Sequence, residues 1–173
     1  VHRDDISRIQ SISDRYFLFS AEEIEAYGKD LLALTKRPIR ICGMVKNEGQ
    51  PGGGPYFVDA DGIPKKQIVE KAQISLENHH QQLMLRSSHF NPVFMVLDFH
   101  DMEGNKFDLQ QYRNDEQYFL VEKSQKGKSV KFIEQPGLWN GSMENWISVF
   151  VEIPEDTFSP VKTVLDLLDA AHR

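Results

Sequence analysis

Glu70 is the side chain in this sequence whose position most directly suggests chemistry. If residues 66–74 form a strand, alternation places Glu70 on the same face as Ile68 and Ile74, which is the more hydrophobic face. A carboxylate in such surroundings is costly unless it is paired or bound to a polar group. Two interpretations stay open. One is an internal ion pair, with Arg40 as the candidate partner, and the other is a ligand-binding acid at the mouth of a cleft.

Lys162 raises a second question about charge. Ser159 is a good N-cap and Pro160 suits the first helical position, so the sequence predicts a helix that starts at one of these two residues. Lys162 then falls at the third helical position, where a cation opposes the helix dipole by about 0.3–1 kcal/mol. A bound anion such as a phosphate would explain the arrangement. The alternative is a solvated surface lysine.

A run of three glycines, Gly52 to Gly54, lies between two prolines. It lacks the Lys-Ser/Thr ending of a P-loop, and a strand-like segment follows it instead of a helix. Glycine also lets a backbone approach a ligand closely, so the loop either faces a ligand or simply turns. Asn91 precedes Pro92 at the start of an apolar segment. It is either a turn residue or a polar side chain that projects into a site.

Composition excludes several classes of function. The net charge is −6 and no long basic run occurs, which argues against non-specific binding to nucleic acid. No apolar run reaches the length of a membrane span. The single cysteine, Cys42, lies in an apolar segment and cannot form an internal disulfide, which favours a cytoplasmic location. Asp98 and His100 share a side but run into a turn, so no metal site is predicted from them.

The elements that must position these residues alternate between helices and strands. Ser20 and Glu23 have capping-box spacing, and Phe19 and Ile24 can form a hydrophobic staple, so a helix over 21–34 is predicted. The predicted fold class is α/β, a mixed sheet flanked by helices. Its other expected elements are a central strand at 39–45, two strands joined at 59–62, a short helix at 78–88, a buried strand at 92–99, a hairpin with its turn at 125–128, a strand at 147–153 and the last helix.

Six segments together resemble a family of uncharacterised bacterial proteins that is classified as a domain of unknown function. They are "RPIRICGMVKNEGQPGGGPYFV", "QIVEKAQIS", "HFNPV", "GNKFDL", "PGLWNGSM" and "FVEIPEDTFSPVKTVLDLL". The resemblance covers residues 37–173. Members of that family are longer, so this chain is expected to be a C-terminal part. Residues 1–36 are then expected to form a helical lead-in segment.

The order of these motifs is also similar to the later half of UDP-N-acetylhexosamine pyrophosphorylases, which are nucleotidyltransferases with a GT-A-like fold. In that family a glycine, a strand glutamate and an asparagine contact the sugar, and a late lysine contacts the phosphates. By motif position the resemblance assigns sugar contacts to Gly53, Gly54, Glu70 and Asn91, and a catalytic role to Lys162. Residues 37–173 would be the sugar-side part of the domain.

The sequence departs from the pyrophosphorylase pattern at several motifs. "HFNPV" lacks the second Gly-Asn, and Thr163 stands where the family has asparagine. The glycine-rich nucleotide-binding loop and the metal-binding acids of the first half are absent. The resemblance therefore implies an incomplete enzyme, with no cofactor in this chain and Mg²⁺ in the complete protein.

The function expected from the resemblance is the sugar-binding half of a sugar-nucleotide pyrophosphorylase-like protein. Its expected partners are a nucleotide sugar or sugar phosphate and the missing N-terminal part of the same protein. Alternatives are a non-catalytic carbohydrate-binding module and a structural or interaction domain. If the chain is the sugar-binding half of such a protein, Gly54, Glu70, Asn91 and Lys162 are predicted to line one cleft. The same interpretation predicts a sheet with an open or partner-covered edge, because 39–45 is too apolar for an exposed edge.

Overall fold

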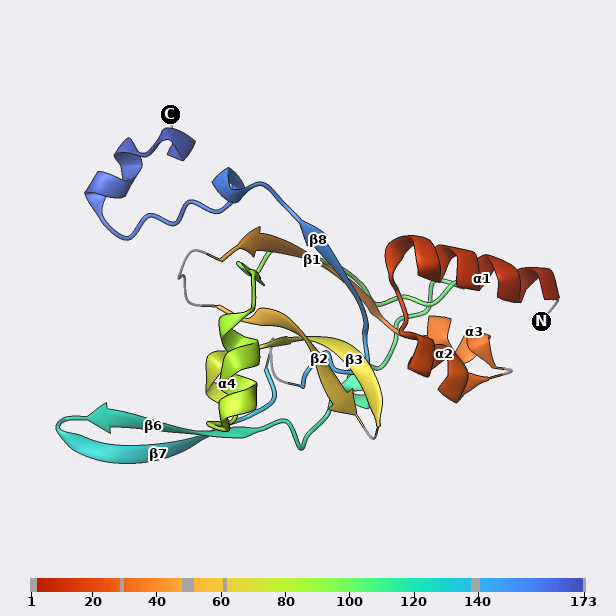
Figure 1. The fold of residues 1–173 in the computed structure, drawn as a ribbon, viewed down its shortest axis with the longest axis horizontal. Coiled ribbons are helices and arrows are strands. Elements are labelled where there is room, and N and C mark those ends of the chain that lie inside the picture. The colour runs from red at the N-terminus through yellow and green to blue at the C-terminus, as the bar shows by residue number, and fades with distance from the viewer. Residues whose placement is uncertain (1–2, 29, 48–51, 61, 138–140, 173) are drawn as a thin grey trace.

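The computed structural model describes residues 3–28, 30–47, 52–60, 62–137 and 141–172 (Figure 1). Its central element is strand β1 (Ile39–Lys46). Strand β8 (Ile147–Glu152) pairs with β1 in parallel on one side, with Arg40 opposite Ser148. On the other side β5 (Met95–Asp98) and β4 (His89–Phe90) pair with β1 in antiparallel orientation, one after the other. The prediction of a central strand at 39–45 is therefore confirmed.

A β-hairpin packs against one face of this sheet. It consists of β2 (Gly54–Ala60) and β3 (Ile63–Val69), and the turn between them was expected. Ile68 lies with Cys42 and Met44 in a small buried core, to which Met95 and Phe150 contribute. This core forms because alternation turns Arg40, Cys42 and Met44 of β1 toward the hairpin. Helix α4 (Asn78–Leu85) lies beside the hairpin and matches the short helix expected there (Figure 1).

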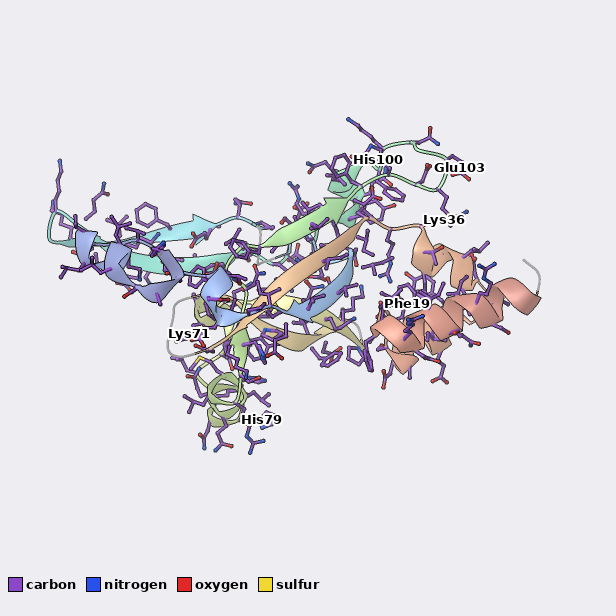
Figure 2. The ribbon with its side chains drawn as sticks, turned by 90° about the horizontal axis from the view of Figure 1, so that it is seen from above. Phe19, Lys36, Lys71, His79, His100 and Glu103 are labelled. Atoms are coloured by element: carbon purple, nitrogen blue, oxygen red, sulfur yellow. The ribbon has the colours of Figure 1, made fainter. Side chains whose placement is uncertain are left out.

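A second hairpin, β6 (Phe119–Gln125) and β7 (Lys128–Glu134), extends from the body of the molecule (Figure 1). Lys126 and Gly127 form its two-residue turn with φ values of 52° and 76°, which is the backbone geometry of a type I′ hairpin turn. The N-terminal helices lie at the opposite end of the sheet (Figure 2). The β6–β7 hairpin was predicted from the sequence, with its turn in the observed place.

The N-terminal helices are α1 (Arg3–Tyr16), α2 (Ala21–Tyr27) and α3 (Leu31–Thr35). The capping box is confirmed, because Ser20 Oγ accepts from Glu23 N–H at 3.0 Å and a Glu23 oxygen accepts from Ser20 N–H at 3.1 Å. The single helix predicted over 21–34 is wrong. Gly28 adopts a φ of +50° and ends α2, and the Asp30 side chain caps α3.

These helices attach to the sheet through a second buried core. Phe19, Leu31 and Leu34 meet Ile147 at the start of β8, and Ile39 of β1 packs against them. None of the helices in the described ranges is both long and apolar enough to cross a membrane.

Two sequence expectations about the remaining chain are wrong. The segment at 92–99 is not a buried strand, because β5 is short and its residues Val96 and Leu97 are exposed. No α-helix starts at Ser159 or Pro160. Instead, 3₁₀ turns occur at Glu155–Thr157, Val164–Leu168 and Ala170–His172. The fold is nevertheless a mixed α/β arrangement, with small sheets and a few helices, as expected at that coarser level.

The sheet is open, as expected. In the described ranges β5 and β8 pair only with β1, so each leaves its outer edge without a strand partner. The face of the sheet opposite the β2–β3 hairpin also carries exposed apolar side chains, among them Ile41, Val96 and Val151.

Candidate functional site

The glycine loop and Asn91 lie side by side. Asn91 N–H donates to the Gly53 carbonyl at 2.8 Å, and Gly54 pairs with Val69 of β3. A Cβ atom on Gly54 would lie 2.7 Å from Ser87 Oγ, and one on Gly52 would lie 2.8 Å from a ring carbon of Phe90. These contacts are too short for a side chain. The described glycines therefore allow the chain to approach itself closely.

The Asn91 side chain is buried and bonded within the protein. Its Nδ2 donates to the Gly43 carbonyl at 2.8 Å, and its Oδ1 accepts from Val93 N–H at 3.1 Å. Val93 has a φ of 69°, an unusual value for a β-branched residue. The Asn91 amide thus holds a strained turn against β1, and these hydrogen bonds occupy it.

Glu70 lies just beyond the end of β3. The expected alternation past Val69 is wrong, because Lys71–Gln73 form a 3₁₀ turn and Gln73 Oε1 accepts from Glu70 N–H at 2.9 Å. The ion pair with Arg40, one of the two interpretations left open for Glu70, does not occur, since Arg40 donates to Ser148 Oγ and Gln67 Oε1 instead. Burial, together with the nearby Glu134 carboxylate, raises the pKa of the Glu70 carboxyl.

A Glu70→Gln variant is expected to be more stable than the wild type at neutral pH. The raised pKa means that the folded state binds the proton more tightly than the unfolded state, so stability falls as pH rises through the Glu70 titration. We expect a gain below about 1 kcal/mol, because solvent screens this partly exposed carboxyl. The gain should vanish below about pH 4, where the carboxyl is protonated in both states.

Urea unfolding of both proteins at the two pH values measures this effect. Glu116→Gln, at an exposed glutamate, is the matched control. A loss of stability on Glu70→Gln at neutral pH would instead indicate a favourable interaction of the carboxylate.

Lys162 lies in the exposed C-terminal segment. Thr163, not Ser159, is the N-cap of the following turn, so Lys162 precedes that turn instead of occupying its third position. Asp166 Oδ2 accepts from the backbone N–H groups of Lys162 and Thr163 at 2.7 and 2.6 Å. These bonds lower the pKa of the Asp166 carboxyl. Asp166 thus occupies the backbone N–H groups at the start of this turn, near which a bound anion was one of the two interpretations of Lys162.

The structure does not bring all the predicted site residues together. Gly53, Gly54 and Asn91 meet at one corner of the β2–β3 hairpin, and Glu70 follows the residue paired with Gly54. The segment that carries Lys162 lies on the other side of β1 from this hairpin (Figure 1).

A groove runs along the β2–β3 hairpin, and we call it the hairpin groove. It consists of two adjoining cavities of about 170 Å³ and 300 Å³, which share Val58, Val69 and Gln73. We call the smaller one the polar half, because three glutamines and a glutamate are among its lining residues, and the larger one the apolar half. The polar half is also lined by Gln67, Ile68, Gln117, Gly141 and Glu144. The apolar half is also lined by Tyr56, Phe57, Asp59, Ile74, Ser75, His80 and Leu83.

Sequence reasoning missed the hairpin groove as a site. It did not single out Gln67 or Gln73, which line the groove. The available signal was three glutamines, Gln67, Gln73 and Gln117, in or beside segments predicted as strands.

A buried hydrogen-bond network fixes the floor of the polar half. Arg40, which is 1% exposed, donates from Nη2 to Gln67 Oε1 at 2.7 Å and from Nε to Ser148 Oγ at 2.8 Å. Gln67 Nε2 then donates to the Glu144 carbonyl at 2.7 Å. Burial lowers the pKa of Arg40. The network orients the Gln67 amide and joins β1, β3 and β8.

The Glu144 side chain also lines the polar half of the groove. It is buried, and one of its oxygens accepts from Asn114 Nδ2 at 2.8 Å. Gln73, which is half-buried, uses its Oε1 for Glu70 N–H. A carboxylate accepts through two oxygens and an amide nitrogen carries two donors, so each side chain can bond a ligand as well.

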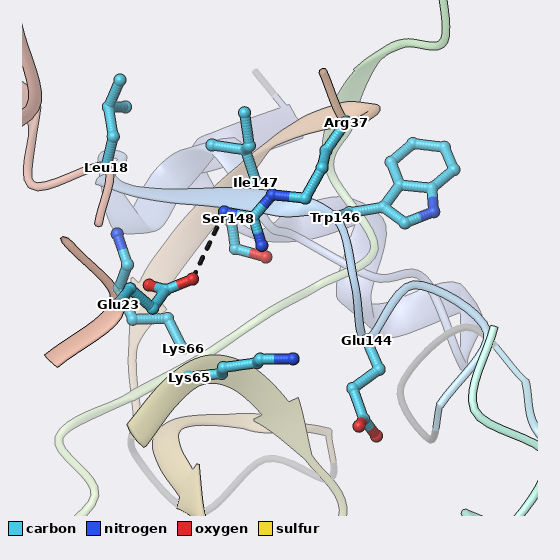
Figure 3. Close-up of a pocket in the computed structure, with 9 residues that line it drawn as sticks. All are labelled: Leu18, Glu23, Arg37, Lys65, Lys66, Glu144, Trp146, Ile147 and Ser148. Atoms are coloured by element: carbon cyan, nitrogen blue, oxygen red, sulfur yellow. Dashed lines mark hydrogen bonds and ion pairs between the residues drawn. The ribbon is translucent and has the colours of Figure 1, made fainter. Parts of the chain in front are cut away.

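A smaller charged crevice lies between α2 and the sheet (Figure 3). Glu23 and Arg37 form a buried ion pair at 3.3 Å, and Lys66 Nζ donates to the Phe17 carbonyl. Burial lowers the pKa of Lys66, and Glu23 opposes this shift. The cavity of about 10 Å³ has room for no more than a water molecule. The ion pair and the Lys66 hydrogen bond in this crevice therefore attach the N-terminal helices to the rest of the fold.

The described residues do not provide a metal site. Asp98 Oδ1 and His100 Nδ1 are 3.2 Å apart, but no three His, Cys, Asp or Glu side chains in the described ranges are grouped to hold an ion.

Comparison with known proteins gives a family without a known activity. No curated protein matches the chain. A family model described as "Domain of unknown function (DUF4301)" matches residues 8–173, which is all but the first seven of the 173 residues. The chain therefore belongs to this domain-of-unknown-function family.

Proposed function

We propose that this protein binds a sugar, free or as part of a nucleotide sugar, in the hairpin groove. The observation that supports the proposal is the lining of the groove. Its polar half presents the side chains of Gln73, Gln117 and Glu144 above the buried Gln67 amide, and its apolar half presents Tyr56 and Phe57 among other apolar groups.

Sugar chemistry matches such a lining. Each hydroxyl group both donates and accepts, and an amide side chain offers a donor and an acceptor on the same group. A carboxylate accepts from two hydroxyls. Aromatic and aliphatic groups can cover the C–H face of a sugar ring, and a pocket with a few placed polar groups on an apolar wall is typical of small-molecule sites. The ligand class that fits is therefore neutral and polyhydroxylated.

Within this proposal the protein is the sugar-binding part of a nucleotidyltransferase-like protein with a GT-A-like fold. Support comes from the order of the motifs and from the meeting of Gly53, Gly54 and Asn91 at one end of the hairpin. Because Asn91 is fully engaged in the interior, we assign the sugar contacts to the groove side chains. Glu70 contributes to sugar binding indirectly, because its backbone N–H donates to Gln73 Oε1 and so orients the Gln73 side chain.

We do not extend the proposal to nucleotidyl transfer by this chain. Among the described residues that line the groove none follows Glu144 in the sequence, so Lys162 is not one of them. The phosphate-contacting role that the resemblance implies for Lys162 stays a prediction for a complete protein.

Gln73→Ala is expected to weaken sugar binding at least tenfold, which corresponds to the loss of about one hydrogen bond to the ligand. Isothermal titration with N-acetylglucosamine and with UDP-N-acetylglucosamine measures the affinities. Gln111→Ala is the matched control, because Gln111 is exposed and bonds only to Asp108 among the described side chains.

Lys162→Ala should bind free N-acetylglucosamine like the wild type. The proposal is contradicted if the wild type binds neither probe, or if Gln73→Ala and the wild type have the same affinity. A loss restricted to UDP-N-acetylglucosamine in Lys162→Ala would bring Lys162 into the site, at the phosphate end.

A further inference from the structure

The sheet carries an apolar surface that the described chain leaves uncovered. We call it the open face, and it consists of the side chains of Ile41, Phe94, Val96 and Val151, which are 40–68% exposed. The strand register places them on one side of the sheet. Ile41 pairs with Val96, Val151 pairs with Gly43, and a Cβ atom on Gly43 would lie 3.3 Å from Phe94 Cβ.

The C-terminal segment carries a second uncovered apolar surface. In the C-terminal arm, residues 159–172, the apolar side chains are 51–81% exposed, and four of them are Val161, Val164, Leu165 and Leu168. Their spacing of three, four and seven residues is that of one side of a helix. In one chain no α-helix forms there, so these groups lie exposed in and beside 3₁₀ turns, and large exposed apolar groups that are close in one segment mark an interaction site.

The connection from β8 to the arm crosses one end of the open face. A Cβ atom on Gly43 would lie 2.8 Å from Ile153 Cδ1, and Phe158 packs edge-to-face against Phe90 with ring centroids 5.3 Å apart. Phe90 pairs with Val45, which alternation places on the same side as Ile41. The chain is thus attached to this face just before the arm begins.

Beyond that attachment the arm leaves its own sheet (Figure 1). Pro154 and Pro160 stiffen the connection, and a 3₁₀ turn at Glu155–Thr157 lies between them. Because Phe158 is held by Phe90, the arm would have to reverse direction at once to reach the open face of its own chain. A second copy removes that requirement, because its open face can approach the arm from outside the chain.

We propose that the C-terminal arm of one chain covers the open face of a second copy, and that the exchange is reciprocal and produces a homodimer. Each chain then supplies one arm and one face, so that two equal contacts form about a two-fold axis. Both apolar surfaces of each chain are removed from water by the same association. The occupant of the open face is therefore the stretch from Val161 to Leu168 of the other chain.

The expected mass in solution is twice the 20.0 kDa of one chain. Light scattering after size exclusion, over a range of protein concentrations, measures it. Leu165→Asp in the arm and Val96→Asp on the open face should each give a monomer with an unchanged far-UV circular dichroism spectrum, because both side chains are exposed in one chain. Leu120→Asp, at an exposed leucine of β6 outside both surfaces, is the matched control and should stay dimeric.

Mixing the two monomeric variants tests the exchange itself. The intact arm of Val96→Asp can dock on the intact face of Leu165→Asp, so the mixture should regain a dimer with one of the two contacts. A dimer that joined two open faces without the arms would not be restored by mixing.

A cysteine pair, Val96→Cys with Leu165→Cys, adds a covalent readout, because the native Cys42 is buried. Oxidation should produce a disulfide-linked dimer. The proposal is overturned by a wild type that is monomeric at every concentration, by a Leu165→Asp protein that remains dimeric, or by a disulfide that forms within one chain.

Discussion

Replacing Arg40 with alanine is expected to lower the free energy of unfolding by about 3–5 kcal/mol. The change removes the donors that satisfy Gln67 Oε1 and Ser148 Oγ, and it leaves a cavity where the largest fully buried side chain was. Two buried acceptors without partners cost about 1–3 kcal/mol each. Urea unfolding followed by circular dichroism measures the loss.

Two further variants separate the effect of the Arg40 hydrogen bonds and charge from the effect of its buried volume. Arg113→Ala removes an arginine whose ion pair with Asp115 is exposed, so it should change stability by about 0–1 kcal/mol. Arg40→Met keeps most of the buried volume and removes only the hydrogen bonds and the charge. If Arg40→Met is as stable as the wild type, the network around Gln67 contributes no net stability, because the desolvation of the guanidinium cancels its bonds.

Asn91→Ala is expected to destabilise the fold by about 2–4 kcal/mol. The buried amide bonds the Gly43 carbonyl and the Val93 N–H, and it holds Val93 at a positive φ. Without the amide, the Gly43 carbonyl loses a donor and the strained turn loses its support. Thermal and urea unfolding both measure the effect.

The same variant tests the role that the resemblance assigns to Asn91. Asn105→Ala is the control, because Asn105 is exposed and bonds only to Asp101 among the described side chains. A contact to sugar would give a variant that is as stable as the wild type but does not bind N-acetylglucosamine. We expect the opposite pattern, a less stable protein whose folded fraction still binds.

Local signals predicted local structure well. The capping box at Ser20 and the turn at Lys126 and Gly127 depend on residues a few positions apart, and both occur where the sequence indicates. The C-terminal helix had equally good start signals at Ser159 and Pro160, but it does not form. Short helices depend on packing for most of their stability, and in one chain the apolar side of this segment has little to pack against.

The candidate site was less predictable because it is assembled from distant residues. Gln67 bonds the carbonyl of Glu144, 77 residues away, and no local pattern contains that pairing. The error at Glu70 has another cause. Hydrophobic alternation continues past Val69 in the sequence, but the Gln73 side chain bonds Glu70 N–H and turns the chain out of the strand. A side-chain cap of this kind is invisible to a hydropathy pattern.

The parallel pairing of β1 with β8 has a consequence for synthesis on the ribosome. Arg40 and Ser148 are 108 residues apart, and Ile147 completes the core under the N-terminal helices. At about 5–20 residues per second, β1 waits several seconds after its own translation before its parallel partner β8 exists. Loop closure over so long a stretch also makes this pairing slow. During that interval one edge of β1 lacks its parallel partner, and we expect the nascent chain to need chaperones more than a chain whose sheet is built from neighbouring strands.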